Sequence, residues 1–281
     1  MEVVPGSRIR ILISRPQGRV RGTAILIHGL GGSAESGYLR RTARMALQRG
    51  WAAVRVNLRN CGGTEALART LYNAGQSEDA GRVLEALESA ELPRPFGLVG
   101  FSLGGNLALR YAALAGVEGR ADAVIGINPP VDLEACVRSL EEPRNAAYQA
   151  YFTWKLCRLL RRIARNRPIP GPVPKARLIR SVRRFDTLYT APDGGYSSAE
   201  HYYQISSSCP HLDALRVPTL ILSSRNDPFV PADMFDPIRA SGSPKLRLLL
   251  PVSGGHVGYW QSNEPRFWAG QAALDFLEEV T

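Results

Sequence analysis

The sequence predicts an α/β fold in which a mostly parallel sheet of eight strands carries helices on both faces. Short apolar runs alternate with helical stretches of roughly 10 to 15 residues, the pattern of a parallel sheet with crossover helices. Several runs are apolar throughout, as strands buried on both faces are. The stretch 132–199 breaks the alternation, because it has helical patterns and no convincing buried strand. We therefore expect one domain, 1–281, with a helical cap inserted at 132–199.

The chain is expected to begin with an antiparallel hairpin at the edge of this sheet. The β-prone runs 2–4 and 8–14 are separated by Pro5, Gly6 and Ser7, which form a turn signal. The second run begins with alternating Arg and Ile, as a half-exposed strand does. These two runs supply two of the eight strands.

The other six strands and their helices follow from apolar runs and helix-end signals. Ser77 offers an N-cap before acidic Glu78 and Asp79, and Pro93 prevents that helix from continuing. The helix expected at 38–48 should end before Gly50, because glycine is common just beyond the end of a helix. The expected strands are 23–28, 52–57, 96–101, 121–127, 218–223 and 246–251, and the expected helices are 38–48, 78–92, 103–115 and 265–279.

The composition favours a soluble protein. At 281 residues and 44% hydrophobic, the chain can bury a large core. No apolar run approaches the roughly 18 to 20 residues of a membrane span, and the N-terminus is charged where a signal peptide is apolar. We expect a cytoplasmic protein. The cysteines are far apart and lack Cys-x-x-Cys spacing, so we expect neither disulfides nor a zinc site: Cys61, Cys136, Cys157 and Cys209.

The net charge of +10 is concentrated in one segment. Residues 144–184 contain 12 basic and no acidic residues, so the rest of the chain nets −2. The ordinary interpretation is a solvated cationic face of the cap. The alternatives are weak association with an anionic lipid surface or an anionic substrate, and nucleic-acid binding. No nucleic acid is expected, because no recognised nucleic-acid motif accompanies the charges.

A serine at the junction of a predicted strand and helix is the candidate nucleophile. Gly100, Ser102 and Gly104 form the pattern Gly-x-Ser-x-Gly, which is weak evidence by itself. The setting after strand 96–101 and before helix 103–115 is the one that a nucleophile elbow requires. The flanking glycines allow a turn too tight for Cβ atoms, so we expect Ser102 to be nucleophilic.

The base and the acid follow from chain order. His256 lies in a glycine-rich loop after the last strand, and it follows every other candidate, as the order Ser, Asp, His requires. Asp227 follows the expected strand 218–223, and a carboxylate there would orient the His256 imidazole. Asp233 and Asp236 are the alternatives for the acid. His28, at an earlier strand end, is assigned a structural role.

An oxyanion needs two preorganised donors. The backbone N–H of Leu103, directly after the nucleophile, is expected to be one. The second is expected from the glycine-rich loop after strand 23–28, where Leu30 follows His28 and Gly29. In the cap, Tyr148, Tyr151 and Phe152 recur at helical intervals and are candidates for packing on the sheet or for binding the acyl chain.

Taken together, the motifs resemble the YheT-like branch of the α/β hydrolases, which is related to the ABHD esterases and monoacylglycerol lipases. The resemblance covers nearly the whole chain and implies the same triad. It departs at Asn60, where the family usually has Gly; Asn tolerates positive φ. The matching segments are 28–33, 59–63, 72–80, 100–106, 202–203, 217–222, 226–229 and 254–258.

The resemblance implies hydrolysis of medium-sized carboxylic esters through an acyl-enzyme, without metal or organic cofactor. A small-molecule ester would be the substrate; the oligomeric state is left open. An acyltransferase with the same triad is the nearest alternative, since an alcohol would replace water in the second half-reaction. A non-catalytic binding protein on a hydrolase scaffold is the other alternative, and the intact triad argues against it.

Overall fold

A seven-stranded sheet forms the core of the computed structural model, which describes residues 1–173, 179–262 and 266–281. Its strand order is β3-β5-β4-β6-β7-β8-β9. All neighbouring pairs are parallel except β3 and β5, which are antiparallel. The predicted α/β architecture is therefore confirmed. The strands are β3 (Arg10–Ser14), β4 (Thr23–Ile27), β5 (Ala52–Asn57), β6 (Phe96–Phe101), β7 (Ala123–Ile127), β8 (Thr219–Leu222) and β9 (Leu246–Leu249).

The N-terminal hairpin differs from the expectation, and the main sheet has seven strands in the described residues rather than eight. β1 (Glu2–Val4) pairs with β2 (Ser7–Arg8) in a separate two-stranded sheet. The predicted run 8–14 is divided between these two sheets at Ile9, whose side chain is buried in the core. Only its second part, β3, joins the main sheet, because it pairs along its full length with β5.

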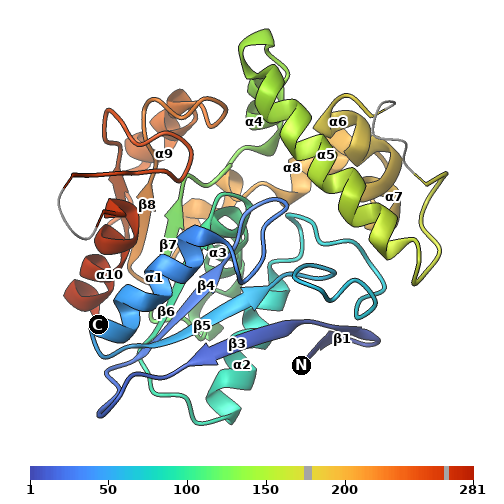
Figure 1. Ribbon diagram of the computed structural model, residues 1–281. Coiled ribbons are helices and arrows are strands. Elements are labelled where there is room, and N and C mark those ends of the chain that lie inside the picture. The colour runs from blue at the N-terminus through green and yellow to red at the C-terminus, as the bar shows by residue number, and fades with distance from the viewer. Residues whose placement is uncertain (174–178, 263–265) are drawn as a thin grey trace.

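Helices cover both faces of the main sheet (Figure 1). α1 (Gly37–Gln48) and α10 (Trp268–Val280) pack on one face, and α2 (Glu78–Ser89) and α3 (Leu103–Ala115) pack on the other. The five residues of β4 are all buried; Leu26 belongs to the first of these layers and its neighbours Ile25 and Ile27 to the second. A strand covered on both faces explains why this run is apolar without alternation.

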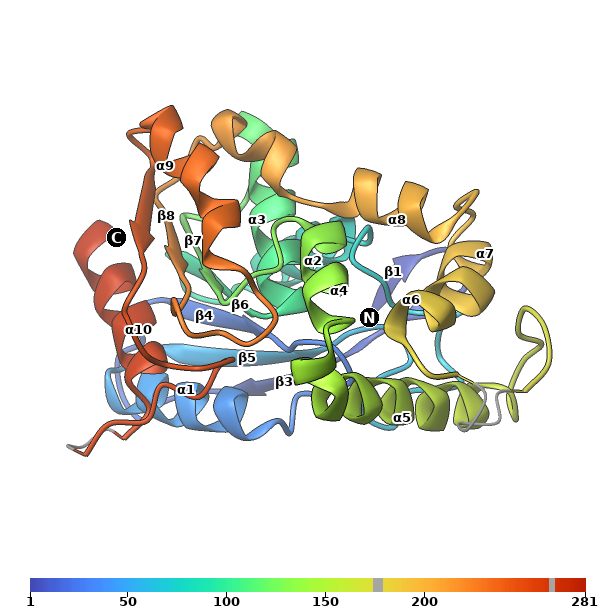
Figure 2. The ribbon, with the colours of Figure 1, turned by 90° about the horizontal axis from the view of Figure 1, so that it is seen from above.

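The chain between β7 and β8 is helical in its described part. Figures 1 and 2 show its helices gathered at one side of the sheet. Residues 174–178, which include Lys175 and Arg177 of the basic segment, lie outside the described ranges. None of the helices described is both long and apolar enough to cross a membrane. The principal helices are α4 (Leu133–Leu140), α5 (Ala146–Ile163), α6 (Val182–Phe185), a π-helical turn (Asp186–Thr190), α7 (Ala191–Asp193) and α8 (Ala199–Ser206).

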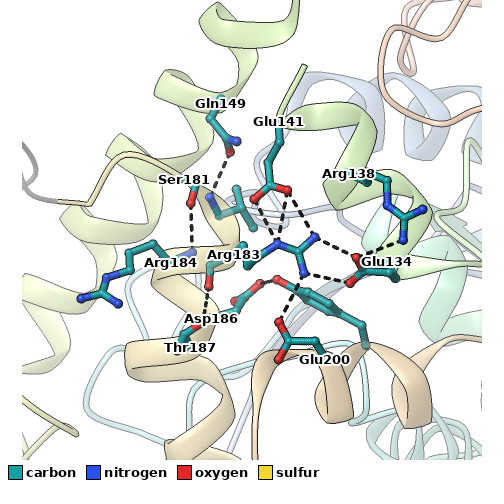
Figure 3. A network of polar contacts seen from close by, with 12 residues as sticks. Glu134, Arg138, Glu141, Gln149, Ser181, Arg183, Arg184, Asp186, Thr187 and Glu200 are labelled. Atoms are coloured by element: carbon teal, nitrogen blue, oxygen red, sulfur yellow. Dashed lines mark hydrogen bonds and ion pairs between the residues drawn. The ribbon is translucent and has the colours of Figure 1, made fainter. Parts of the chain in front are cut away.

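One arginine connects three of these helices. The Arg183 guanidinium on α6 donates to both carboxylate oxygens of Glu134 on α4 at 2.9 Å, and Glu141 and Glu200 also accept from it (Figure 3). It also lies 5.6 Å from the ring centre of Tyr203 on α8. These contacts neutralise one of the twelve basic residues and join helices that are distant in sequence.

Candidate active site

Ser102 lies in a sharp turn between β6 and α3, with φ of 52° and ψ of −124°. Such a backbone is strained for a residue other than glycine. The two flanking glycines are required sterically: a Cβ at Gly100 would lie 2.1 Å from the Gly104 carbonyl oxygen, and one at Gly104 would lie 2.5 Å from the Ile27 carbonyl oxygen. The Gly-x-Ser-x-Gly spacing is thus explained by the close packing of this turn against β4.

The structure brings Ser102, His256 and Asp227 together. His256 Nε2 lies 2.9 Å from Ser102 Oγ, and His256 Nδ1 lies 2.7 Å from Asp227 Oδ2. An ionised carboxylate only accepts hydrogen bonds, so Nδ1 carries the proton and Nε2 is free to accept the proton of the serine hydroxyl. The imidazole also packs against Phe229, with ring centres 4.2 Å apart. This arrangement can remove a proton from the serine and return it to a leaving group.

The Asp227 carboxylate is held by three further donors. Its Oδ1 accepts from the N–H groups of Phe229 at 3.1 Å and Val230 at 3.0 Å, and Asn128 Nδ2 donates to Oδ2 at 2.6 Å. Asn128 was not predicted from the sequence. The signal was present, because this polar residue directly follows β7, which pairs with β6, the strand that precedes Ser102.

The two alternative acids lie elsewhere. Asp233 and Asp236 are exposed, and Asp236 lies 3.7 Å from Arg239. The histidine loop is instead tied to the segment that carries Asp227: Asn226 Oδ1 accepts from the N–H groups of Gly254 and Gly255 at 3.0 and 2.9 Å.

The loop after β4 runs against the nucleophile. A Cβ at Gly29 would lie 2.8 Å from Ser102 Cβ, so only glycine allows this approach. The Gly29 N–H donates to the Tyr38 hydroxyl and the Gly31 N–H to the Tyr72 hydroxyl. Between them, the Leu30 N–H has no acceptor among the described residues, and neither has the Leu103 N–H. Both are therefore available as donors near Ser102.

His28 is fully buried, and its ring bridges two loops. Leu58 N donates to Nε2 at 3.2 Å, so Nδ1 is the protonated nitrogen and donates to the Gly29 carbonyl at 2.8 Å. Burial lowers the pKa of His28 to about 4, which keeps the ring neutral. Its geometry suits a structural role that orients the loop carrying Leu30.

An apolar cavity of about 100 Å³ adjoins Ser102. The loop of Leu30, the start of α3 and the helices between β7 and β8 enclose it. Most of its lining is aliphatic or aromatic, including Leu133, Val137, Leu140, Phe152, Leu156, Leu159, Leu160, Val182, Phe185, Phe229 and Val230.

Of the three cap residues proposed to bind the acyl chain, Phe152 lines this cavity, whereas Tyr148 and Tyr151 are not part of its lining. The buried face of α5 is centred on Phe152, Leu156 and Ile163, at steps of about one or two helical turns. Tyr148 and Tyr151 lie at the edge of this face and are 43% and 50% exposed. Their rings nevertheless pack on Phe229 and Phe152, at 5.3 and 5.5 Å.

One carboxylate, that of Asp186, lies in the otherwise mainly apolar lining. Asp186 is buried, and the Tyr203 hydroxyl donates to its Oδ2 at 2.7 Å. Burial raises the pKa of Asp186 to about 6, although hydrogen bonds from Thr190 and Tyr203 oppose the shift. This part of the cavity is therefore neutral below about pH 6 and anionic above it.

Comparison with known proteins identifies the group to which these features belong. A family model described as the alpha/beta hydrolase fold matches residues 24–262. The putative esterase YheT of Escherichia coli is 33% identical over 90% of this chain and 75% of its own length. A monoacylglycerol lipase of Saccharomyces cerevisiae is 28% identical over 90% of this chain, and the match covers 58% of the yeast protein's length. The crystal structure of the alpha/beta hydrolase GrgF from Penicillium sp. superimposes with a TM-score of 0.66 at 17% identity, covering 97% of this chain and 94% of that one.

Proposed function

Because this chain belongs to the α/β-hydrolase fold family, and within it to the esterase and lipase type, we propose that it cleaves esters of short-to-medium acyl chains with Ser102 as nucleophile. The general class, carboxylic ester hydrolase, follows from the family. One observation carries the assignment of the residues: the continuous hydrogen-bonded chain from Ser102 through His256 to Asp227.

The proposed reaction has two halves. His256 removes the proton of Ser102 as the hydroxyl oxygen attacks the ester carbonyl, and it then gives the proton to the departing alcohol. Water enters, loses a proton to His256 and attacks the acyl-enzyme; the acid leaves as His256 returns the proton to the Ser102 oxygen. Asp227 stabilises the imidazolium in both halves, and its donors Asn128, Phe229 and Val230 keep the carboxylate in position.

The N–H groups of Leu30 and Leu103 are proposed to hold the oxyanion. They have no acceptor in the described part of the chain, so an oxygen that becomes negative in the transition state would be their first partner. The bonds that the hydroxyls of Tyr38 and Tyr72 accept on either side of Leu30 would keep this loop from moving when substrate arrives.

The apolar cavity is proposed to hold the acyl chain under a cap formed by residues 132–199, within a single domain of residues 1–281. The support is its lining, since Ser102 is one of its few polar wall residues and α4, α5 and α6 supply most of the rest. Each acyl methylene transferred from water into such a wall contributes up to about 0.8 kcal/mol.

The outer side of the cap is proposed to associate weakly with an anionic lipid surface. Tyr148, Tyr151 and Trp154 on α5 are each at least 43% exposed. Arg165 and Arg184 are exposed and have no carboxylate partner in the described residues. Exposed aromatic and basic side chains suit the boundary of an anionic bilayer. Sedimentation with vesicles should show binding that needs anionic lipid and disappears at high salt; binding equal to that of neutral vesicles would exclude this proposal.

The function is tested with p-nitrophenyl esters of increasing acyl length. We expect kcat/KM to rise from acetate to a maximum between butyrate and octanoate and to fall for palmitate. Peptide amides should be poor substrates. A maximum at acetate would mean that the cavity does not take the acyl chain, and efficient peptide cleavage would overturn the ester assignment. Analysis of the products with added alcohol distinguishes hydrolysis from acyl transfer, because a transferase would form the new ester in preference to the free acid.

A further inference from the structure

A second cleft, of about 370 Å³, lies on the other side of the loop that carries Leu30. One wall is the polar side of α5, and the opposite wall consists of two glycine-rich loops, 31–36 and 61–63. Its composition contrasts with that of the apolar cavity, because only a few of its lining side chains are apolar. The lining residues that matter here are Lys155, Arg158, Arg162, Gly31, Gly62 and Gly63.

The charge of this cleft is positive and only partly balanced. Lys155, Arg158 and Arg162 are spaced three and four residues apart, so they share one side of α5. Arg162 is paired with Glu65 at 2.9 Å. Lys155 and Arg158 have no carboxylate partner in the described part of the chain; their charged groups lie 5.0 Å and 5.4 Å from the ring centres of Tyr151 and Trp154.

The acidic member of the lining does not offset these two charges. Glu35 is bonded to Arg55 at 3.1 Å and lies 3.9 Å from Arg40, so two other arginines already share its charge. Two cations with a third nearby, in a concave space, favour an anion over a neutral group.

The glycine loops leave the backbone accessible to a ligand. Gly31, Gly62 and Gly63 have positive φ values of 64°, 65° and 83°. A Cβ at Gly62 would meet the Asn57 side chain, whereas one at Gly63 would meet no atom within 4 Å. The Lys155 side chain lies over Gly31, since a Cβ at that glycine would be 3.1 Å from Lys155 Cδ. The N–H groups of Gly62 and Gly63 have no acceptor among the described residues, and such groups supplement cationic side chains in anion sites.

The cleft adjoins the active site. Leu159 lines both spaces, and the consecutive residues Leu30 and Gly31 line the cavity and the cleft respectively. A ligand that reached from one space to the other would therefore pass the proposed oxyanion donor. An acyl chain would take the apolar side, which leaves the alcohol part of the ester to face the cations.

We propose that this cleft binds a phosphate or carboxylate group on the alcohol part of the ester, with Lys155 and Arg158 as its principal ligands. This proposal rests on the proposed ester hydrolysis and names the class of substrate: an acyl ester of an anionic alcohol. Guanidinium and ammonium groups form strong charge-assisted hydrogen bonds with both kinds of anion.

The test compares monobutyrylglycerol with monobutyrylglycerol 3-phosphate, which are water-soluble and differ only in the anion. We expect the wild type to prefer the phosphate ester in kcat/KM by about tenfold or more at low salt, mainly through a lower KM. Lys155→Met and Arg158→Gln should each reduce this preference by about tenfold. Arg161→Gln is the matched control, because Arg161 is an exposed cation of the same helix that does not line the cleft, and it should retain the preference.

Further measurements identify what causes the preference for the phosphate ester. Inorganic phosphate should compete with the phosphate ester and not with the neutral ester. Adding phosphatidylcholine vesicles should leave the preference unchanged, since the site recognises the anion and not a bilayer. An equal loss of preference in Arg161→Gln would assign the effect to general surface charge and overturn the site, as would equal use of the two esters by the wild type.

The site can also be tested without turnover. In the Ser102→Ala variant, monobutyrylglycerol 3-phosphate should raise Tm more than monobutyrylglycerol does, and Lys155→Met should remove the difference. A failure of ester hydrolysis in the wild type would count against the proposed function. A missing difference in Tm would count against the anion site, so the two failures are distinguishable.

Discussion

Two regions of the molecule are stabilised by different interactions: the loops at the ends of the strands, and the helices between β7 and β8. Around Ser102, His256 and Asp227, polar atoms meet at 2.6 to 3.3 Å, and every oxygen of the Asp227 carboxylate has two partners. Across the cavity, the helices present mainly apolar side chains, and ion pairs such as those of Arg183 hold them together at a distance from Ser102.

This difference separates reactivity from selectivity. Directional bonds tolerate little displacement, so a change at the strand ends should alter the rate of the chemical step by orders of magnitude. Apolar walls act in proportion to the area that they cover, so a change among the helices should alter substrate preference by small factors. Variants at the strand ends and in the helices can therefore test this separation.

Ser102→Ala should lower kcat for a p-nitrophenyl ester roughly 10⁶-fold, because the attacking oxygen is lost. Labelling by a fluorophosphonate probe should disappear, while circular dichroism and Tm should stay near the wild type. Full labelling of the variant would show that another residue is the nucleophile.

Asp227→Asn should lower kcat on the order of 10⁴-fold, because an amide at this position no longer fixes the histidine tautomer. Asp233→Asn and Asp236→Asn are the matched controls; both residues are exposed, and their variants should remain close to the wild type. If one of the controls were the inactive variant, the acid would have been misassigned.

Val137→Phe should reduce kcat/KM for octanoate by about tenfold relative to acetate, because Val137 lines the cavity and a larger ring would occupy the space for several methylenes. Ile205→Phe is the control on α8, at a side chain that is 40% exposed. A uniform loss for all chain lengths in Val137→Phe would indicate damage to the catalytic geometry and would break the proposed separation.

Asp186→Asn should raise the free energy of unfolding above that of the wild type, and this gain should be about 2 kcal/mol larger at pH 8 than at pH 4.5. The ordinary Asp pKa of 3.8 is raised to about 6 by burial, so the folded state binds a proton more tightly than the unfolded state does. The wild type therefore loses stability as pH rises from about 4 through 6, where burying the ionised carboxylate becomes costly. The asparagine oxygen can still accept the bond from Tyr203. Denaturant unfolding of both proteins at both pH values measures this difference. If the free energy of unfolding changed with pH equally in the variant and the wild type, the raised pKa of Asp186 would be contradicted.

The strands that each coincide with one short apolar run were the easiest elements to predict. The strands at 23–28, 52–57 and 96–101 appear within a residue or two of the expected bounds, since each apolar run is buried as a unit. Asn60 adopts the positive φ, 61°, that its place in the turn requires. The division of the run 8–14 was not predictable, because both halves are β-prone and only pairing with β5 separates them.

For the candidate site, the sequence by itself determined the types of residue and their order. A serine between two glycines, an aspartate after one strand and a histidine after the next can be read locally, because each depends on its own turn. Only the tertiary structure decided what depends on distance: that Asn128 supports Asp227, that Phe152 rather than Tyr151 lines the cavity, and that Lys155 and Arg158 face the glycine loops. The physical reason is that helix rotation and the meeting of loops are set by packing across the whole core, which no short segment encodes.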